Sequence, residues 1–142
     1  MSRRILLAAV LCLAAYGARA DEQPIELKAD LVGAHEVPSV DSSGKGKLQA
    51  ALNKGTKELR YTVTYQDLSG PATAAHFHGP AEQGKNAGIA LPINGALQSP
   101  IKGVATLDDK QMGDLLANRW YVNIHTAKNP NGEIRGQVTQ GY

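Results

Sequence analysis

The sequence is short of cysteine: among 142 residues it has one, Cys12. A single thiol cannot close an intramolecular disulfide, so burial of apolar side chains has to hold the fold together. The sequence also lacks a large excess of either charge, since it has 15 Lys and Arg against 13 Asp and Glu. Internal repeats, a phosphate-binding glycine loop, a Ser/His/Asp order and a carboxylate pair are absent too. The last three absences remove the usual signs of hydrolase chemistry.

The one long apolar run stands near the N-terminus and predicts an export signal. Arg3-Arg4 precede the run Ile5–Ala15, and Ala18-Arg19-Ala20 has the A-x-A pattern of a cleavage site. The run is too short to span a bilayer, and no second one follows it. We therefore expect a signal peptide at 1–20 that is cleaved near Ala20. Export by the general route and by the twin-arginine route both remain open. The remaining domain, 21–142, is expected to be periplasmic or secreted, without a transmembrane segment.

Cleavage would change the composition of the protein. Cys12 would be lost, leaving a cysteine-free domain. Three arginines would be lost as well, so that 12 basic residues would face 13 acidic ones, a net charge of −1. A balanced charge of this kind gives no electrostatic footprint for nucleic acid, and we expect no nucleic-acid partner.

Alternation of apolar and polar side chains predicts a chain built mostly of short β-strands. The clearest strand is Glu58–Gln66, where alternate residues are apolar over the whole length. The same rhythm predicts further strands over Ile25–Leu31, Gly46–Asn53, Thr73–His78, Ile89–Ile93 and Ile101–Leu107. Asp108–Asn118 is the one plausible helix, capped by Asp108. Seven or eight strands with one short helix predict an all-β, Greek-key β-sandwich.

Two strands near the C-terminus predict a hairpin. Trp120–His125 and Ile134–Val138 both alternate, and the turn Asn129-Pro130-Asn131-Gly132 separates them. If both apolar sets face the core, His125 must share the opposite face with the polar side chains of the second strand, Glu133, Arg135 and Gln137. The hairpin therefore presents one polar face.

Three segments together resemble the CHRD domain family, which takes its name from the repeats of chordin. They are Leu31–Pro38, Tyr65–Gly70 running into Ala74–Ala81, and Tyr121–Gln137. The resemblance spans nearly the whole expected mature chain and implies an immunoglobulin-like sandwich of a kind widespread in exported bacterial proteins. It implies little about biochemistry, because chordin is an extracellular growth-factor antagonist and that role does not transfer to a free-standing domain.

The four histidines all lie in these segments, and three of them predict a metal site. His76 and His78 are two residues apart on one strand face, with Cβ atoms about 7 Å apart. With His125 they supply three imidazoles, which suit copper and zinc. His35 is an optional fourth ligand, although the family usually has Asn or Gln there. Glu133 and Asn123 are candidates to hydrogen bond a ligand histidine and fix its tautomer.

The kind of metal chemistry is left open by the sequence. Without Cys12 a thiolate blue-copper centre is excluded, and Met112 alone cannot make a methionine-rich copper carrier. The histidine pattern is similar to part of Cu/Zn superoxide dismutase, although the zinc subsite and the disulfide of that enzyme are missing. On this similarity Arg135 would attract the anionic substrate.

Two further alternatives need no catalysis. The histidines can simply be polar residues facing water, and Arg135 can be an ion-pair partner of Glu133 or Asp67. The protein would then be a non-enzymatic adhesion or binding module whose polar face contacts a protein or a glycan.

Overall fold

The computed structural model describes residues 23–141, and the expected signal segment 1–20 lies outside them. Over the described residues the chain forms short strands, one α-helix and a single 3-10 turn, η1 (Gly33–His35). The strands are β1 (Ile25–Val32), β2 (Lys45–Asn53), β3 (Glu58–Gln66), β4 (Ala72–His78), β5 (Ile89–Pro92), β6 (Ile101–Thr106), β7 (Tyr121–Thr126), β8 (Ile134–Gln137) and β9 (Thr139–Gln140). The helix is α1 (Asp109–Leu116). Every predicted strand and the predicted helix are present, with ends within two residues of those expected.

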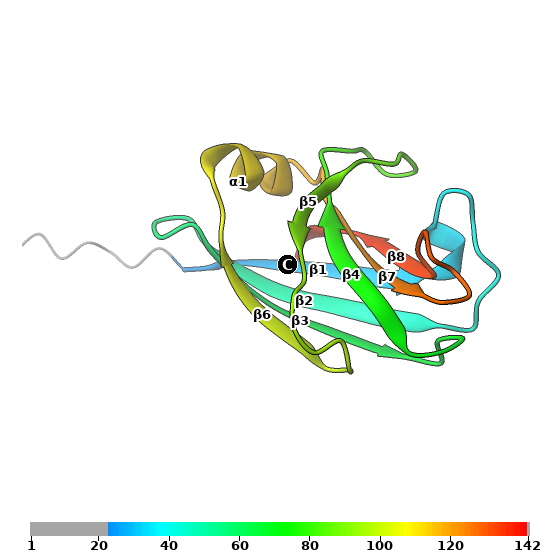
Figure 1. The fold of residues 1–142 in the computed structure, drawn as a ribbon. Helices are drawn as coiled ribbons and strands as arrows, with labels where there is room; N and C mark the ends of the chain where they lie inside the picture. Colours follow the sequence, from blue (N-terminus) through cyan, green and yellow to red (C-terminus); the bar gives the residue numbers. More distant parts are fainter. Residues whose placement is uncertain (1–22, 142) are drawn as a thin grey trace, which may run out of the picture.

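One continuous antiparallel sheet curls into two layers. Its strand order is β5-β4-β7-β8-β1-β2-β3-β6, with β9 added beside β1. Figure 1 shows β1, β2, β3 and β6 in one layer and β4, β5, β7 and β8 in the other. The chain changes layer after β3, after β5 and again after β6, because β6 pairs with β3 while β7 pairs with β4. The expected all-β sandwich is confirmed.

The core lies between the layers and is formed by the predicted apolar faces. On β3 the residues Leu59, Tyr61 and Val63 are buried while their neighbours are more exposed. Trp120 and Phe77 are among the largest fully buried side chains. The helix begins as predicted: the Asp108 side chain accepts from the backbone N–H of Gln111, whose own side chain bonds back to Asp108. No helix within residues 23–141 has the length and apolar character that crossing a bilayer requires.

The predicted register of the last hairpin is confirmed, but its polar face is not open to water. Asn123 pairs with Arg135 across β7 and β8, so His125 and Arg135 share one face as expected. Glu133 does not join them, because it precedes β8 and its carboxylate bonds to Thr126, which alternates with His125 along β7. Every residue of β7 is nonetheless buried. The loop 79–88 covers this face, since Asn86 and Lys85 accept hydrogen bonds from Arg135. Burying a polar face in this way requires specific partners for each group, and the candidate site lies among them.

Candidate metal centre

The strand geometry brings two of the predicted ligands onto one face of β4. Ala75 and Phe77 point into the core, so His76 and His78 emerge together on the other side. Their ring centroids lie 5.5 Å apart. The strand alternation predicted from the sequence therefore places both imidazoles on the same face of β4.

His125 joins them from the neighbouring strand. β4 and β7 pair so that Ala74 lies opposite His125, His76 opposite Asn123, and His78 opposite Tyr121. The small side chain of Ala74 leaves room for the imidazole across the strand pair, as expected. The other small residues act elsewhere, because Ala75 is in the core and Gly79 packs against Trp120.

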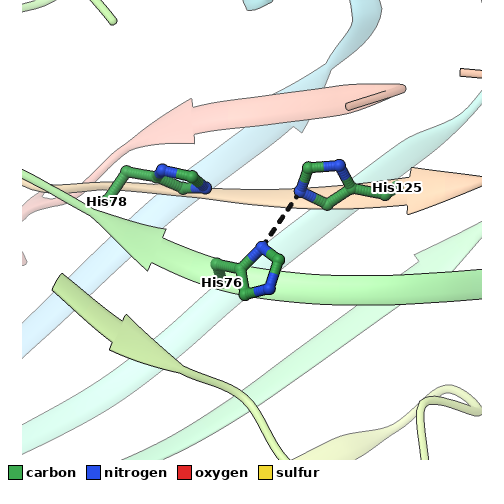
Figure 2. Close-up of side chains that lie close together, drawn as sticks. All are labelled: His76, His78 and His125. Carbon is green, nitrogen blue, oxygen red and sulfur yellow. Dashed lines mark hydrogen bonds between the residues drawn. The ribbon is translucent and has the colours of Figure 1, made fainter. Parts of the chain in front are cut away.

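The three imidazoles converge. One ring nitrogen from each of His76, His78 and His125 lies within 4.8 Å of the others. Figure 2 shows the three rings turned toward one another, with the contact between His76 Nδ1 and His125 Nε2 drawn as a dashed line. These two atoms are 3.1 Å apart. The structure therefore brings together the three histidines that the sequence predicted to meet.

Backbone carbonyls fix the tautomers of two of these rings. His78 Nδ1 lies 3.0 Å from the carbonyl oxygen of Ala87, and His125 Nδ1 lies 2.9 Å from that of Pro130. A carbonyl oxygen can only accept, so each Nδ1 must carry the proton. In the neutral rings both Nε2 atoms then have a free lone pair, and both point into the cluster. This is the orientation that a metal-binding imidazole needs.

Asn123 lies at the centre of the cluster and is 3% exposed. Its Oδ1 is 3.1 Å from His78 Nε2 and 3.0 Å from His125 Nε2. The sequence predicted that Asn123 would contact a ligand histidine, and it contacts two.

Glu36 is a neighbour of this cluster that the sequence analysis missed. Its buried Oε1 accepts a long hydrogen bond, 3.5 Å, from Asn123 Nδ2. Burial raises the pKa of Glu36 to about 7, although Arg135 and Asn123 act in the opposite direction. Gly132 makes room for this pair, since a Cβ there would overlap Glu36 and lie 2.6 Å from Asn123 Nδ2. The only sequence signal was that Glu36 and Gly132 both fall inside the segments that resemble the family.

Burial favours the neutral form of the two histidines of β4. Burial lowers the pKa of His76, and the charges that His125 and His78 would carry lower it further. Burial also lowers the pKa of His78 and outweighs the oxygens of Ala87 and Asn123, which favour the protonated ring. Neutral imidazole is the form that binds a metal ion.

The predicted role of Glu133 needs correction. It is fully buried, and its carboxylate accepts from the hydroxyl groups of Ser42, Ser69 and Thr126 and from the backbone N–H of Ser69. Glu133 was expected to accept from a ligand histidine, but none of these bonds goes to one, and His125 Nδ1 bonds to the Pro130 carbonyl. Glu133 thus ties loops together at one end of the sandwich, a role that short-range sequence pattern does not reveal.

Arg135 is also placed differently from either expectation. It is 2% exposed, and its guanidinium lies 3.4 Å from the centre of the Tyr121 ring. It pairs with neither Glu133 nor Asp67, because its hydrogen bonds go to Asn86 and Lys85. The ring of Tyr121 also stacks on His78, with centroids 4.8 Å apart and planes 3° from parallel. Since β7 lies between β4 and β8, Tyr121 separates the guanidinium from the imidazole.

His35 does not reach the cluster. It is exposed in η1 and lines a different hollow of about 230 Å³, which it shares with Lys28, Gln83 and Arg135. The optional fourth ligand expected from the sequence is therefore placed apart from the other three histidines. His35 remains useful as a histidine that a test of the cluster can use as a control.

The fold and the site define a class: an all-β sandwich with a three-histidine cluster on one strand pair. The chain belongs to the CHRD domain family, whose match covers residues 27–138. It is similar to chordin of Xenopus laevis, with 29% identity over 129 residues, which is 85% of this chain. The chain spans only 13% of the length of that relative. No solved structure matches the chain.

Proposed function

We propose that this CHRD domain binds one copper or zinc ion through His76, His78 and His125. The observation that carries the proposal is the convergence of three ring nitrogens within 4.8 Å, from two strands. Two of the rings are oriented by backbone carbonyls, so that their free lone pairs face inward. Three imidazoles are the donor set of many zinc and copper sites, and for a fixed site copper is the tighter binder.

Elemental analysis of protein without a histidine tag tests the proposal. We expect one equivalent of copper or zinc after loading and removal of loose metal. His76→Ala or His125→Ala should abolish loading, because two imidazoles alone bind much more weakly. His35→Ala is the matched control and should load normally, as should Lys128→Ala. Wild-type protein that retains no metal would end the proposal and leave the non-enzymatic module, with a protein or glycan partner, as the better explanation.

Superoxide dismutation is a second candidate, which one electrostatic observation favours. The buried guanidinium of Arg135 lies against the Tyr121 ring, which in turn stacks on His78, so a positive charge stands close to the cluster. A bound copper ion would supply one-electron redox chemistry. Arg135 would then attract the superoxide anion through its field rather than by contact, since Tyr121 stands between them.

The rate of superoxide loss, compared with that of free copper, tests this candidate. Arg135→Gln should slow the reaction at low salt, and the difference should shrink at high salt. Arg135→Lys keeps the positive charge but loses the guanidinium N–H groups that bond to Asn86 and Lys85 in the loop 79–88. It therefore separates the effect of the charge on the rate from the effect of the loop position. A copper-loaded protein no faster than free copper would reject the enzyme and keep the binding site.

We also propose that the domain is exported and works in the periplasm or outside the cell. Support comes from the basic start, the apolar run Ile5–Ala15 and the cleavage pattern ending at Ala20. The first strand begins at Ile25, a few residues beyond this point. The protein should be recovered in a periplasmic extract with the intact mass of a chain that begins at Asp21, and full-length protein confined to the cytoplasmic fraction would argue against export.

A further inference from the structure

The amide of Asn123 lies where a further ligand of the proposed ion would lie. Two atoms bound about 2.0–2.1 Å from one ion are about 2.9–3.4 Å apart, for angles between square-planar and tetrahedral values. Asn123 Oδ1 is 3.0 Å from His125 Nε2 and 3.1 Å from His78 Nε2. His76 Nδ1 is 3.1 Å from His125 Nε2. Three neighbouring contacts in the cluster therefore already have the separations of atoms that share an ion.

The contacts of Asn123 with the imidazoles are not satisfied as ordinary hydrogen bonds. His78 Nε2 carries no proton in the neutral ring, because Nδ1 donates to Ala87. An amide oxygen has no proton either, so lone pairs face each other across 3.1 Å. A cation between them would turn this repulsion into attraction.

Glu36 fixes which atom of the amide faces the histidines. Asn123 Nδ2 donates to Glu36 Oε1, so Oδ1 is the amide atom that faces the cluster. Gly132 allows both side chains to occupy this place, since a Cβ would collide with each of them. All three residues are buried, so the orientation is set by packing as well as by the hydrogen bond.

We infer that Asn123 Oδ1 is the fourth ligand of the proposed ion and that Glu36 is a positioning residue for it. The inference rests on the proposed function. It makes the site a set of three nitrogens and one neutral oxygen, with ligands from β4 and β7 only. The three imidazoles select zinc or copper, and the amide oxygen adds a weaker fourth ligand, as amide and backbone oxygens do in some copper sites.

Metal affinity and the copper EPR spectrum of full-length variants test the inference. Asn123→Ala should bind one equivalent of Zn(II) or Cu(II) about 10–100-fold more weakly than wild type, measured by chelator competition. Glu36→Ala should weaken binding in the same direction, whereas Glu36→Gln keeps a carbonyl acceptor and should restore most of it. The control is Asn131→Ala, because Asn131 is an exposed asparagine next to Gly132 in the turn between β7 and β8. This variant should leave the affinity unchanged.

The double variant Glu36→Gln, Asn123→Asp decides between ligation and mere positioning. In the wild type Asn123 donates to Glu36; in the double variant the amide introduced at position 36 donates to the carboxylate introduced at position 123. A carboxylate oxygen then replaces the amide oxygen at the ion. A ligand at this position should change the copper hyperfine splitting, and a residue that only orients the rings should not. This variant also keeps the test decisive if Asn123→Ala does not fold.

Two outcomes count against the inference, and they differ in what else they remove. If the wild type binds no ion, the proposed function falls with it. If the wild type binds, but removal of the amide leaves affinity unchanged or the double variant leaves the spectrum unchanged, the fourth-ligand assignment alone is overturned.

Discussion

At the scale of single residues, Glu133 shows how a buried charge can be a structural centre rather than a catalytic one. Its side chain is fully buried, and no cation of the described residues 23–141 pairs with it, yet it accepts from three hydroxyl groups and one backbone N–H. Burial alone would raise the pKa of Glu133. The hydrogen bonds outweigh burial and lower the pKa to about 2.

This lowered pKa predicts a specific dependence of stability on pH. A carboxyl group whose pKa falls on folding, here from 4.5 to about 2, stabilises the protein above the unfolded value. The contribution, about 3 kcal/mol, is lost as the pH falls from 4.5 toward 2. Glu133→Gln should therefore be less stable at pH 7 by about that amount, and its difference from wild type should shrink at pH 3.

Urea unfolding followed by fluorescence of the buried Trp120 measures this dependence. Glu82→Gln changes an exposed carboxylate and is the matched control, with little effect at either pH. Parallel pH profiles for wild type and Glu133→Gln would show that the hydrogen bonds do not favour the ionised carboxylate.

At the scale of elements, the turn between β7 and β8 does more than reverse the chain. Gly132 has φ +121°, in a region that favours glycine, and it packs against Glu36 and Asn123. Gly132→Ala should lower the free energy of unfolding by about 1–3 kcal/mol and weaken metal binding as well, since the amide is displaced.

Gly113 offers the opposite case and serves as the control. It lies inside α1, and a Cβ there would meet nothing within 4 Å. Gly113→Ala should stabilise the protein by about 0.5–1 kcal/mol and leave metal affinity unchanged. Thermal or urea unfolding measures the stability of each variant, and chelator competition measures its metal affinity. Equal metal affinity in the two variants would contradict the role given to Gly132.

Much of the candidate site follows from the sequence because strand geometry is periodic. His76 and His78 share a face on any regular strand, and the apolar set of β7 determines the side on which His125 lies. What the sequence could not supply was the loop contacts. The carbonyls of Ala87 and Pro130 carry no side-chain signal, and the separation of Glu36 from Asn123 in sequence hides their hydrogen bond. The burial of Arg135 depends on the loop 79–88 in the same way.

At the scale of the whole molecule, the proposed ion would link two paired strands, β4 and β7, that lie far apart in the sequence. β4 is followed by β5 in its own layer, by β6 in the other layer and by α1, before β7 returns to pair with it. The described domain contains no cysteine, so its long-range links are sheet pairing, the core and hydrogen bonds. A ligand set shared by β4 and β7 forms only when these strands are paired, and metal binding should therefore favour the folded state alone.

This linkage predicts a rise in thermal stability on metal loading. An ion that binds only the folded protein stabilises it by about 2.7 kcal/mol when its free concentration is about 100 times Kd, which for a domain of this size raises Tm by about 10 °C. Scanning calorimetry with Zn(II) should show the rise in wild type and in His35→Ala, and EDTA should reverse it. His125→Ala should melt at the same temperature with and without the ion, because its ligand set cannot close. An equal rise in His125→Ala would mean that the ion stabilises the domain from somewhere other than the β4–β7 pair.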